Sequence, residues 1–192
     1  MIGYRAFIKK NKTLIIVLSI VLVTAGILFF MGRPFFCKCG EIKFWTASME
    51  SAKGSQQLFD PYTFTHLIHG ALFYLILRFL FPRSSFAKRI IIAVFIESAW
   101  EILENSPMII EQYRAATISL DYYGDSILNS IGDIMAMIVA FIAVKRFPVW
   151  VSIIGVIAIE LILLLLIRDN LTLNIIMLLY PVDAIKIWQG GG

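Results

Sequence analysis

Residues 60–82 read DPYTFTHLIHGALFYLILRFLFP, and this stretch decides the fold. It opens with Asp60 and Pro61, a pair typical of the N-cap and first position of a helix. About twenty mainly apolar residues follow before Pro82, enough to cross a hydrocarbon layer of about 30 Å at a rise of about 1.5 Å per residue. The stretch therefore predicts a membrane helix with two histidines, His66 and His69, near its first end.

The composition points to the same class of protein. The 192 residues are 59% hydrophobic and 16% charged, with a mean hydropathy of +0.84. A soluble domain is about 45–50% apolar and about 25% charged. The difference excludes a soluble globular protein and a disordered chain, and two cysteines are too few for a disulfide scaffold. The net charge of +4 does not indicate a nucleic-acid partner, because the basic residues are distributed by membrane side.

We expect an all-α bundle with five transmembrane helices in one integral-membrane domain, residues 1–189. The spans are predicted at about 13–31, 61–81, 86–106, 124–146 and 148–168. The apolar run from Leu171 to Tyr180 is too short to span, so residues 171–188 are predicted as an interfacial segment. A sixth span is the alternative. Residues 190–192, three glycines, are interpreted as a linker or tag remnant.

The distribution of charge predicts the orientation. Basic residues precede the first span and occupy the loops after the second and fourth: Arg5, Lys9, Lys10, Lys12, Arg83, Lys88, Arg89, Lys145 and Arg146. These segments contain no acidic residue. Because short cytoplasmic loops are rich in Lys and Arg, the N-terminus is predicted in the cytoplasm of a bacterium, whose inner membrane the chain would cross. Loops 32–60 and 107–123 and the C-terminus would face the periplasm.

Ionisable and polar side chains recur at one depth on the expected spans. They are Tyr62, His66 and His69 on the second, Glu97, Glu101, Glu104 and Asn105 on the third, Asp125, Asn129 and Asp133 on the fourth, and Arg168 and Asp169 closing the fifth. At 1.5 Å per residue they occupy a layer of about 14 Å below the outer surface. Their helical spacing places each set on one stripe. Since an ionisable group at mid-membrane costs about 2.5–3.5 kcal/mol, the stripes are expected to converge on a polar pocket.

One chemistry that suits this pocket is metal-assisted catalysis. His66 and His69, with carboxylates from neighbouring helices, supply the nitrogen and oxygen ligands that zinc, iron or manganese accept. We expect His66, His69 and Glu101 as ligands, with a position left for water and Glu104 or Asp125 as general base.

Three other interpretations stay open. In a metal-free enzyme, a histidine or glutamate would act as general base while Arg114 or Arg168 holds an anion such as phosphate. In a structural protein, the same groups would form a hydrogen-bond network that ties the helices together. Stacked carboxylates and histidines would also serve ion or proton passage.

The outer loop carries the two cysteines of the chain. Cys37 and Cys39 are separated by one residue, in an oxidising place if the loop is periplasmic. A local disulfide clasp, pairing with another chain, and a metal site with a third partner are the alternatives.

Several motifs resemble those of an uncharacterised family of alphaproteobacterial inner-membrane proteins. The chain has GRP at 32–34, CxCG at 37–40, HxxHG at 66–70, ExxWExxEN at 97–105 and YGDSxxNSxxD at 123–133. The family carries only a "domain of unknown function" label, so the resemblance implies a multi-pass membrane location and no established activity.

A looser similarity is to VanZ-like membrane proteins. These share a histidine in one helix, a glutamate in the next, an arginine in the following loop, and Asp-x-x-x-Asn on the next helix. The matching positions are His66 or His69, Glu97 or Glu101, Arg114, and Asp125 with Asn129. The second histidine, the extra glutamates and the Cys-x-Cys loop depart from that pattern.

The leading hypothesis is a membrane hydrolase or transferase, assisted by a divalent metal, that acts on a lipid or lipid-linked head group from the periplasmic side. The alternative is a non-enzymatic assembly factor or subunit whose polar network is structural. No protein partner is predicted from the sequence.

Overall fold

The computed structural model describes residues 2–47 and 53–191, and its helices confirm the prediction of an all-helical fold. The only β-type pairing in that part of the chain is an isolated bridge between Trp45 and Phe59. The helices are α1 Ile2–Phe30, α2 Thr63–Leu80, α3 Phe86–Glu104, α4 Pro107–Ala116, α5 Ile127–Val144, α6 Val149–Ile167, α7 Leu171–Leu179 and α8 Asp183–Gln189.

Serine caps explain where three of these helices begin. The hydroxyls of Ser85, Ser106 and Ser126 accept hydrogen bonds from backbone N–H groups in the first turns of α3, α4 and α5. Each bond satisfies a donor that has no partner within the helix. The cap at Ser106 and the proline that follows it begin α4 inside a segment that the sequence predicts as an outer loop.

Several helices begin or end a few residues from the expected spans. Helix α2 begins at Thr63, not at Pro61, although the Asp60 carboxylate accepts hydrogen bonds from the N–H groups of Tyr62 and Thr63. Helix α3 ends at Glu104 because α4 begins at Pro107. The segment 171–188 is two helices, which Pro181 separates because it cannot continue the first. Of the predicted linker 190–192, Gly192 lies outside the described residues.

Four helices are long and apolar enough to cross a membrane, which supports a helical membrane protein. They are Asn11–Phe30 within α1, together with α2, α5 and α6. Helix α3 has 19 residues but is not among them, since it carries two basic and three acidic side chains.

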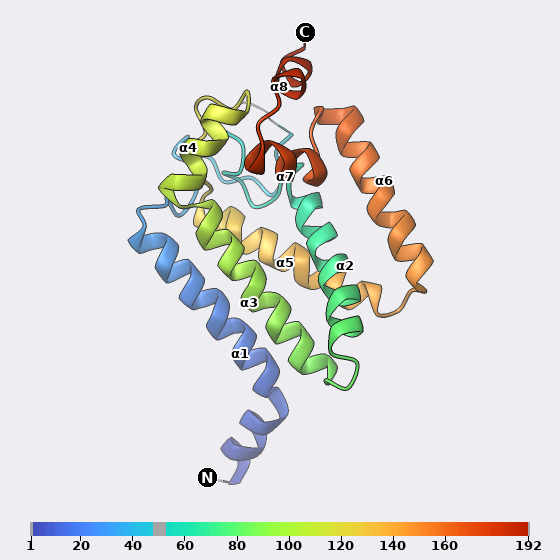
Figure 1. The fold of residues 1–192 in the computed structure, drawn as a ribbon. Coiled ribbons are helices and arrows are strands. Elements are labelled where there is room, and N and C mark those ends of the chain that lie inside the picture. Colours follow the sequence, from blue (N-terminus) through green and yellow to red (C-terminus); the bar gives the residue numbers. More distant parts are fainter. Residues whose placement is uncertain (1, 48–52, 192) are drawn as a thin grey trace.

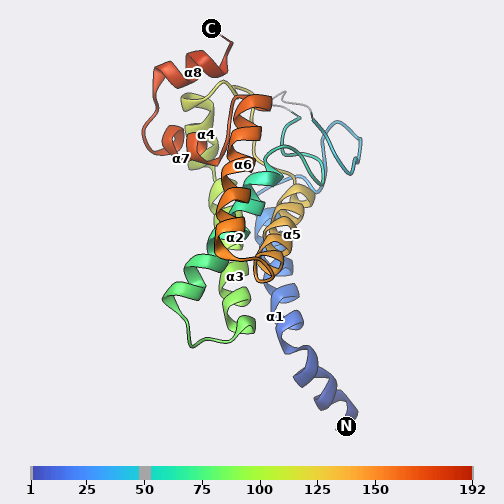
Figure 2. The ribbon, with the colours of Figure 1, turned by 90° about the vertical axis from the view of Figure 1, so that its right-hand side faces the viewer.

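The long helices pack side by side, and the chain ends lie at opposite ends of the bundle (Figures 1 and 2). Helix α2 packs mainly on α5, α1 packs along α3, and α6 contacts α2 from outside. Helices α4, α7 and α8 and the segment before α2 gather at the end opposite the N-terminus, whereas the α2–α3 connection lies toward the other end and the α5–α6 connection about midway. The two ends therefore differ in construction.

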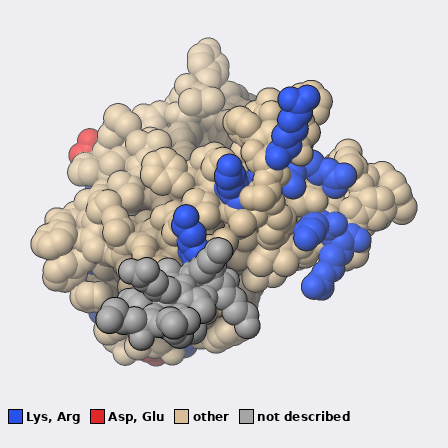
Figure 3. Space-filling model, turned by 90° about the horizontal axis from the view of Figure 1, so that it is seen from below, with Lys and Arg blue, Asp and Glu red and all other residues tan. Residues whose placement is uncertain are grey.

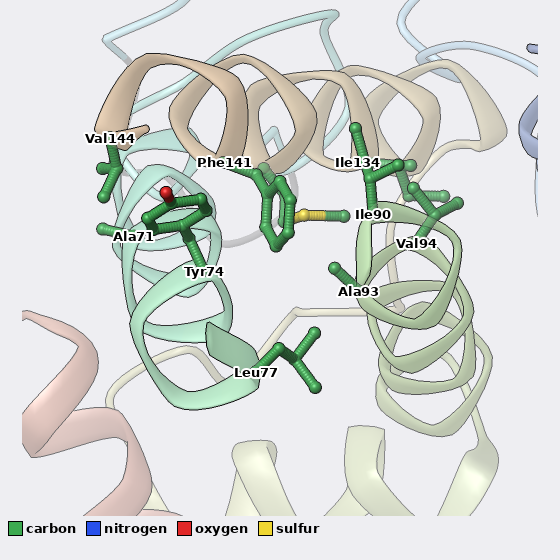
Figure 4. Packing of buried hydrophobic residues seen from close by; sticks show 10 residues of the cluster. Ala71, Tyr74, Leu77, Ile90, Ala93, Val94, Ile134, Phe141 and Val144 are labelled. Carbon is green, nitrogen blue, oxygen red and sulfur yellow. The ribbon is translucent and has the colours of Figure 1, made fainter. Parts of the chain in front are cut away.

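An apolar core fixes α5 between α2 and α3 (Figure 4). Phe141 of α5 is fully buried and meets Tyr74 of α2 at a ring-centroid distance of 5.4 Å. Ile134 and Met137 of α5 and Ala93 of α3 are also fully buried. Burying such side chains contributes about 1.5–3 kcal/mol each for the larger ones. This core sets the mutual position of the three helices that carry the polar groups.

Glycine allows the closest approach between α2 and α5. A Cβ atom added at Gly70 would overlap the backbone oxygen of Met137 and would lie 2.8 Å from the Cβ of Ala140. Gly132 of α5 meets the backbone oxygen of Leu58 in the same way. Only glycine fits at these two contacts, so α5 lies directly against both α2 and the segment that precedes it.

The face of the bundle on the side of the α2–α3 connection is basic. Figure 3 views the molecule from this side and shows several Lys and Arg side chains, with acidic side chains only at the rim. The α2–α3 connection carries Arg83, and the α5–α6 connection carries Lys145 and Arg146.

Candidate functional site

One carboxylate of α3 joins both histidines of α2. The Nδ1 atom of His66 lies 2.6 Å from Oε1 of Glu97. The Nδ1 atom of His69 lies 3.2 and 3.1 Å from the two oxygens of the same carboxylate. The rings sit on one helix face because their positions are three apart, with centroids 5.1 Å from each other. Glu97 is fully buried, so a charged carboxylate here depends on these imidazoles.

Glu101, one helical turn further along α3, has no comparable partner. Both its carboxylate oxygens are buried and accept no hydrogen bond within residues 2–47 and 53–191. The nearest charged or ionisable nitrogen is Nδ1 of His66, 3.5 Å from Oε1. A buried charged carboxylate without donors is costly, and a bound cation would supply the missing stabilisation.

A further carboxylate reaches the same histidine from α5. Oδ2 of Asp133 lies 3.8 Å from Nε2 of His66, and Oδ1 of Asp133 is buried without a hydrogen-bond partner in the described chain. His66 thus has acidic groups from two helices around both ring nitrogens.

Two groups of these side chains have the spacing of metal ligands. One is His66, His69 and Glu97, and the other is His66, Glu101 and Glu104, with all ligand atoms within 4.8 Å of one another in each group. The imidazole and carboxylate donors suit zinc, manganese or iron. The expectation of a site able to bind a divalent metal is supported at this level, although the predicted set of His66, His69 and Glu101 is divided between the two groups.

His66, His69, Glu104 and Asp133 form the polar floor of a cavity of about 190 Å³, whereas the fully buried Glu97 and Glu101 do not line it. Apolar side chains line the part formed by the segment after α4, the end of α6, and α7: Ile118, Ile167, Leu171, Ile175 and Leu178. The cavity therefore has a polar floor and a partly apolar wall.

A hydrogen bond between Tyr62 and Asp169 forms part of the cavity wall near α7. The hydroxyl of Tyr62 donates to Oδ2 of Asp169, 3.0 Å away, and Oδ1 of Asp169 accepts from the N–H of Asn170. Burial raises the pKa of Asp169 to about 6, although both hydrogen bonds act in the opposite direction. The predicted pocket residues Tyr62 and Asp169 thus both line the cavity.

Asp125 lines the cavity and is hydrogen-bonded to Asn105. The amide of Asn105 donates to Oδ2 of Asp125 at 2.9 Å, and its oxygen accepts from the Asp125 N–H at 2.7 Å. The hydroxyl of Tyr122 donates to Oδ1 of Asp125 at 2.8 Å. Because these donors engage both oxygens, the pair ties the end of α3 to the segment before α5.

Other predicted site residues lie outside the cavity. Arg114 donates to the backbone oxygen of Tyr122, and Arg168 donates to that of Trp188 at 3.1 Å. Neither guanidinium lines the cavity, so the structure does not bring them to the histidines. Asn129 is buried and donates to the backbone oxygen of Gln57. Cys37 and Cys39 form a disulfide with each other.

Three aromatic residues of the cavity were not predicted. Trp100, Tyr113 and Tyr122 all line it, and the Trp100 ring meets that of His69 at 6.4 Å. Trp100 is three positions after Glu97, a spacing that places both side chains on one face of the helix, so it could have been assigned from the same pattern. Tyr113 and Tyr122 gave no such signal, because aromatic residues near a membrane surface usually serve as anchors.

Known proteins match most of the chain. The model of a family described as "Protein of unknown function (DUF2585)" matches residues 28–191. A UPF0314 protein of Paracoccus denitrificans is 50% identical over 171 residues, which cover 88% of this chain and 89% of the relative. A UPF0314 protein of Sphingopyxis alaskensis is 48% identical over 174 residues, 91% and 93% of the two chains. One of Rhizobium johnstonii is 44% identical over 182 residues, 95% and 93%. No solved structure matches the chain.

Proposed function

Because the chain belongs to the DUF2585 family of proteins of unknown function, we propose its role from the site itself. It is a membrane enzyme that uses a divalent metal ion to hydrolyse or transfer a lipid-linked head group. The observation that carries this proposal is Glu101, whose two buried oxygens face no hydrogen-bond donor in the described chain and lie beside His66.

The metal would be held by His66, Glu101 and Glu104. This group opens on the cavity through His66 and Glu104, and its Glu101 oxygens accept no hydrogen bond in the described chain, whereas Glu97 of the other group is already engaged by two imidazoles. When bound, the ion would polarise a carbonyl or phosphoryl oxygen of the substrate and lower the pKa of a bound water.

His69 is the general base in this proposal. A carboxylate can only accept, so the hydrogen bond to Glu97 places the proton of a neutral His69 on Nδ1 and leaves the lone pair on Nε2. The ring lines the cavity, and Glu97 holds its orientation. A proton taken from water or from a substrate hydroxyl would reside on Nε2, stabilised by the same carboxylate.

The shape of the cavity supports a lipid-linked substrate. A polar head group would meet the histidine and carboxylates at the floor, while an attached chain would lie along the apolar wall of α6 and α7. Such a division between a few polar groups and an apolar lining is typical of small-molecule sites.

Five spans and a cytoplasmic N-terminus complete the proposal. Helix α3 is the fifth span in this proposal. It packs along α1, and its 19 residues match the length of the other spans. Its acidic side chains face the interior of the bundle and not lipid. The basic face in Figure 3 would lie in the cytoplasm of a bacterial inner membrane, and the cavity would open toward the periplasm.

A network that only ties helices together is the second candidate. It is favoured by the Asn105–Asp125 pair, whose hydrogen bonds leave no free oxygen on the carboxylate. In that case the family would act as a structural subunit or assembly factor.

Glu101→Gln distinguishes the two candidates. The full-length protein in detergent is incubated with a bacterial lipid extract, with and without a chelator, and products are identified by mass spectrometry. For the enzyme, the variant and the chelated protein lose at least about a hundredfold in turnover while the variant melts near the natural protein. Turnover that survives both treatments overturns the enzyme proposal, as does a lipid extract that stays unchanged with the metal-loaded natural protein. The matched control is Glu41→Gln, which removes an exposed carboxylate from the loop before α2.

A further inference from the structure

A second pocket, separate from the histidine cavity, lies between α4 and the segment that follows α1. Its volume is about 240 Å³. Three cations line it, Arg33, Lys38 and Arg114, against one carboxylate, Glu111. The pocket therefore has an excess of positive charge, which in a concave site attracts an anion.

The two arginines are fixed in place by backbone contacts. Arg33 donates through Nη1 to the backbone oxygen of Tyr123, and Arg114 donates through Nε to that of Tyr122. A guanidinium has five N–H donors, so each contact leaves others for a ligand. The Nε of Arg33 is buried without a partner in the described chain, which shows that the donors of this group exceed the acceptors around it.

Gly124 is required for this arrangement. Its φ of +92° is a conformation that favours glycine. A Cβ atom there would overlap Nη1 of Arg33 and would lie 2.9 Å from both Asn105 and Ile110. The backbone at Gly124 therefore lies against the Arg33 guanidinium, closer than a residue with a side chain would allow.

Lys38 is positioned by the disulfide on either side of it. Cys37 and Cys39 are bonded to each other, so the intervening residue is held in a short loop. The Lys38 ammonium lies 4.6 Å from the centroid of the Tyr123 ring, a cation–π distance. The disulfide therefore presents the third cation at the pocket.

Four exposed apolar side chains are close in sequence to residues that line the pocket. Phe30, Phe35, Phe36 and Met108 are all exposed, with Phe30 at 88% and Met108 at 64%, and each lies within three residues of a residue that lines the pocket. In water such exposure is unfavourable, whereas at a bilayer interface these side chains enter the acyl region beside the head groups.

We infer that this pocket binds the phosphate group of an anionic membrane lipid. Arginine and lysine donors match phosphate oxygens, and the exposed apolar side chains meet the acyl chains of the same molecule. The inference uses the proposed membrane orientation but not the proposed activity. The pocket and the histidine cavity are lined by neighbouring residues of one segment, Tyr123 and Tyr122.

The test is calorimetric binding to the full-length protein in neutral detergent, with dihexanoyl phosphatidylglycerol and with inorganic phosphate as probes. We expect the lipid to bind and Lys38→Gln to weaken it about tenfold, since a charge-assisted contact contributes about 1.5 kcal/mol. Lys43→Gln is the matched control, because that lysine lies in the same loop and pairs with Glu41. Among the described residues, Lys38 contacts the Tyr123 ring and its side chain donates no hydrogen bond, so its variant separates binding from folding, as Arg33→Gln and Arg114→Gln do not.

The outcomes distinguish the source of the anion and the role of the first cavity. If Lys38→Gln and the natural protein bind the lipid with equal affinity, the assignment of this pocket as the lipid site is overturned. Inorganic phosphate binding as tightly as the lipid overturns the lipid assignment and indicates a soluble phosphate. The Glu101→Gln variant is expected to bind the lipid normally, so that a failure of the proposed enzyme activity leaves this result unaffected.

Discussion

The two carboxylate oxygens of Glu97 lie 3.2 and 3.1 Å from Nδ1 of His69. This contact joins α3 to α2 and determines which ring nitrogen of His69 carries the proton. We predict that Glu97→Gln lowers turnover by at least about a hundredfold, because an amide can donate to Nδ1 and so stabilise the wrong tautomer. Steady-state rates of the variant with the substrate found in the lipid screen measure this.

The same variant also tests how the contact acts. If Glu97 only held the helices together, Glu97→Gln would lower the melting temperature and leave the residual rate per folded molecule unchanged. A loss of rate in protein that remains folded supports its role in orienting His69. Loss of folding alone contradicts that role.

Gly70→Ala is expected to separate α2 from α5. The added methyl group overlaps the backbone oxygen of Met137, which cannot move without the helix. We predict a loss of about 1–3 kcal/mol in the free energy of unfolding, the usual range for overpacking. Thermal unfolding in detergent measures the change. Gly155→Ala in α6 is the control, because a Cβ there meets nothing within 4 Å, and it should melt at or above the natural protein.

Asp169 should make stability depend on pH. Its folded-state pKa of about 6 lies above the ordinary value of 3.8, so the folded protein binds this proton more tightly than the unfolded chain. The stabilisation is complete below about pH 4 and is lost as the pH rises through 6, with a total of about 3 kcal/mol. The Asp169→Asn variant lacks this titration.

The measurement is the difference in melting temperature between Asp169→Asn and the natural protein at several pH values. We expect the melting temperature of the variant to rise relative to that of the natural protein as the pH rises from 4 to 7. Above pH 7 the difference should stay constant. A difference that is constant over this range means that the carboxyl group titrates normally in the folded state.

Reduction of the Cys37–Cys39 disulfide should weaken lipid binding at the second pocket. The bond holds Lys38 over the Tyr123 ring, and an open loop allows the ammonium to leave that position. We predict a several-fold lower affinity for dihexanoyl phosphatidylglycerol after reduction, and the same in a Cys37→Ser, Cys39→Ser double variant. Affinity that is identical in the oxidised, reduced and double-variant proteins contradicts a role of the disulfide in positioning Lys38.

Helical periodicity places some of the polar side chains where the structure brings them together. His66, Glu97, Glu101 and Asp133 come from three helices and meet because each lies on the polar stripe of its helix. The period of a helix is local information, so one sequence suffices to assign the inward face. The family membership that the motifs indicated is likewise confirmed, while the VanZ-like similarity stays a prediction.

Contacts made outside the long helices could not be predicted in this way. Arg114 was expected beside the histidines, but α4 forms within the predicted loop and places it in the second pocket. Glu160 accepts hydrogen bonds from the N–H groups of Leu171 and Thr172 at the start of α7, a contact that depends on how the chain turns after α6. Such turns depend on tertiary packing, which residue spacing along a helix does not encode.

The central claim is that the buried carboxylate of Glu101 binds a metal ion together with His66 and Glu104. Elemental analysis of the protein, purified from cells supplied with zinc, manganese and iron, tests it most directly. We predict about one equivalent of a divalent metal per chain in the natural protein and in Glu41→Gln, and a much lower content in Glu101→Gln. Equal metal content in Glu101→Gln and the natural protein, or none in either, would contradict the claim.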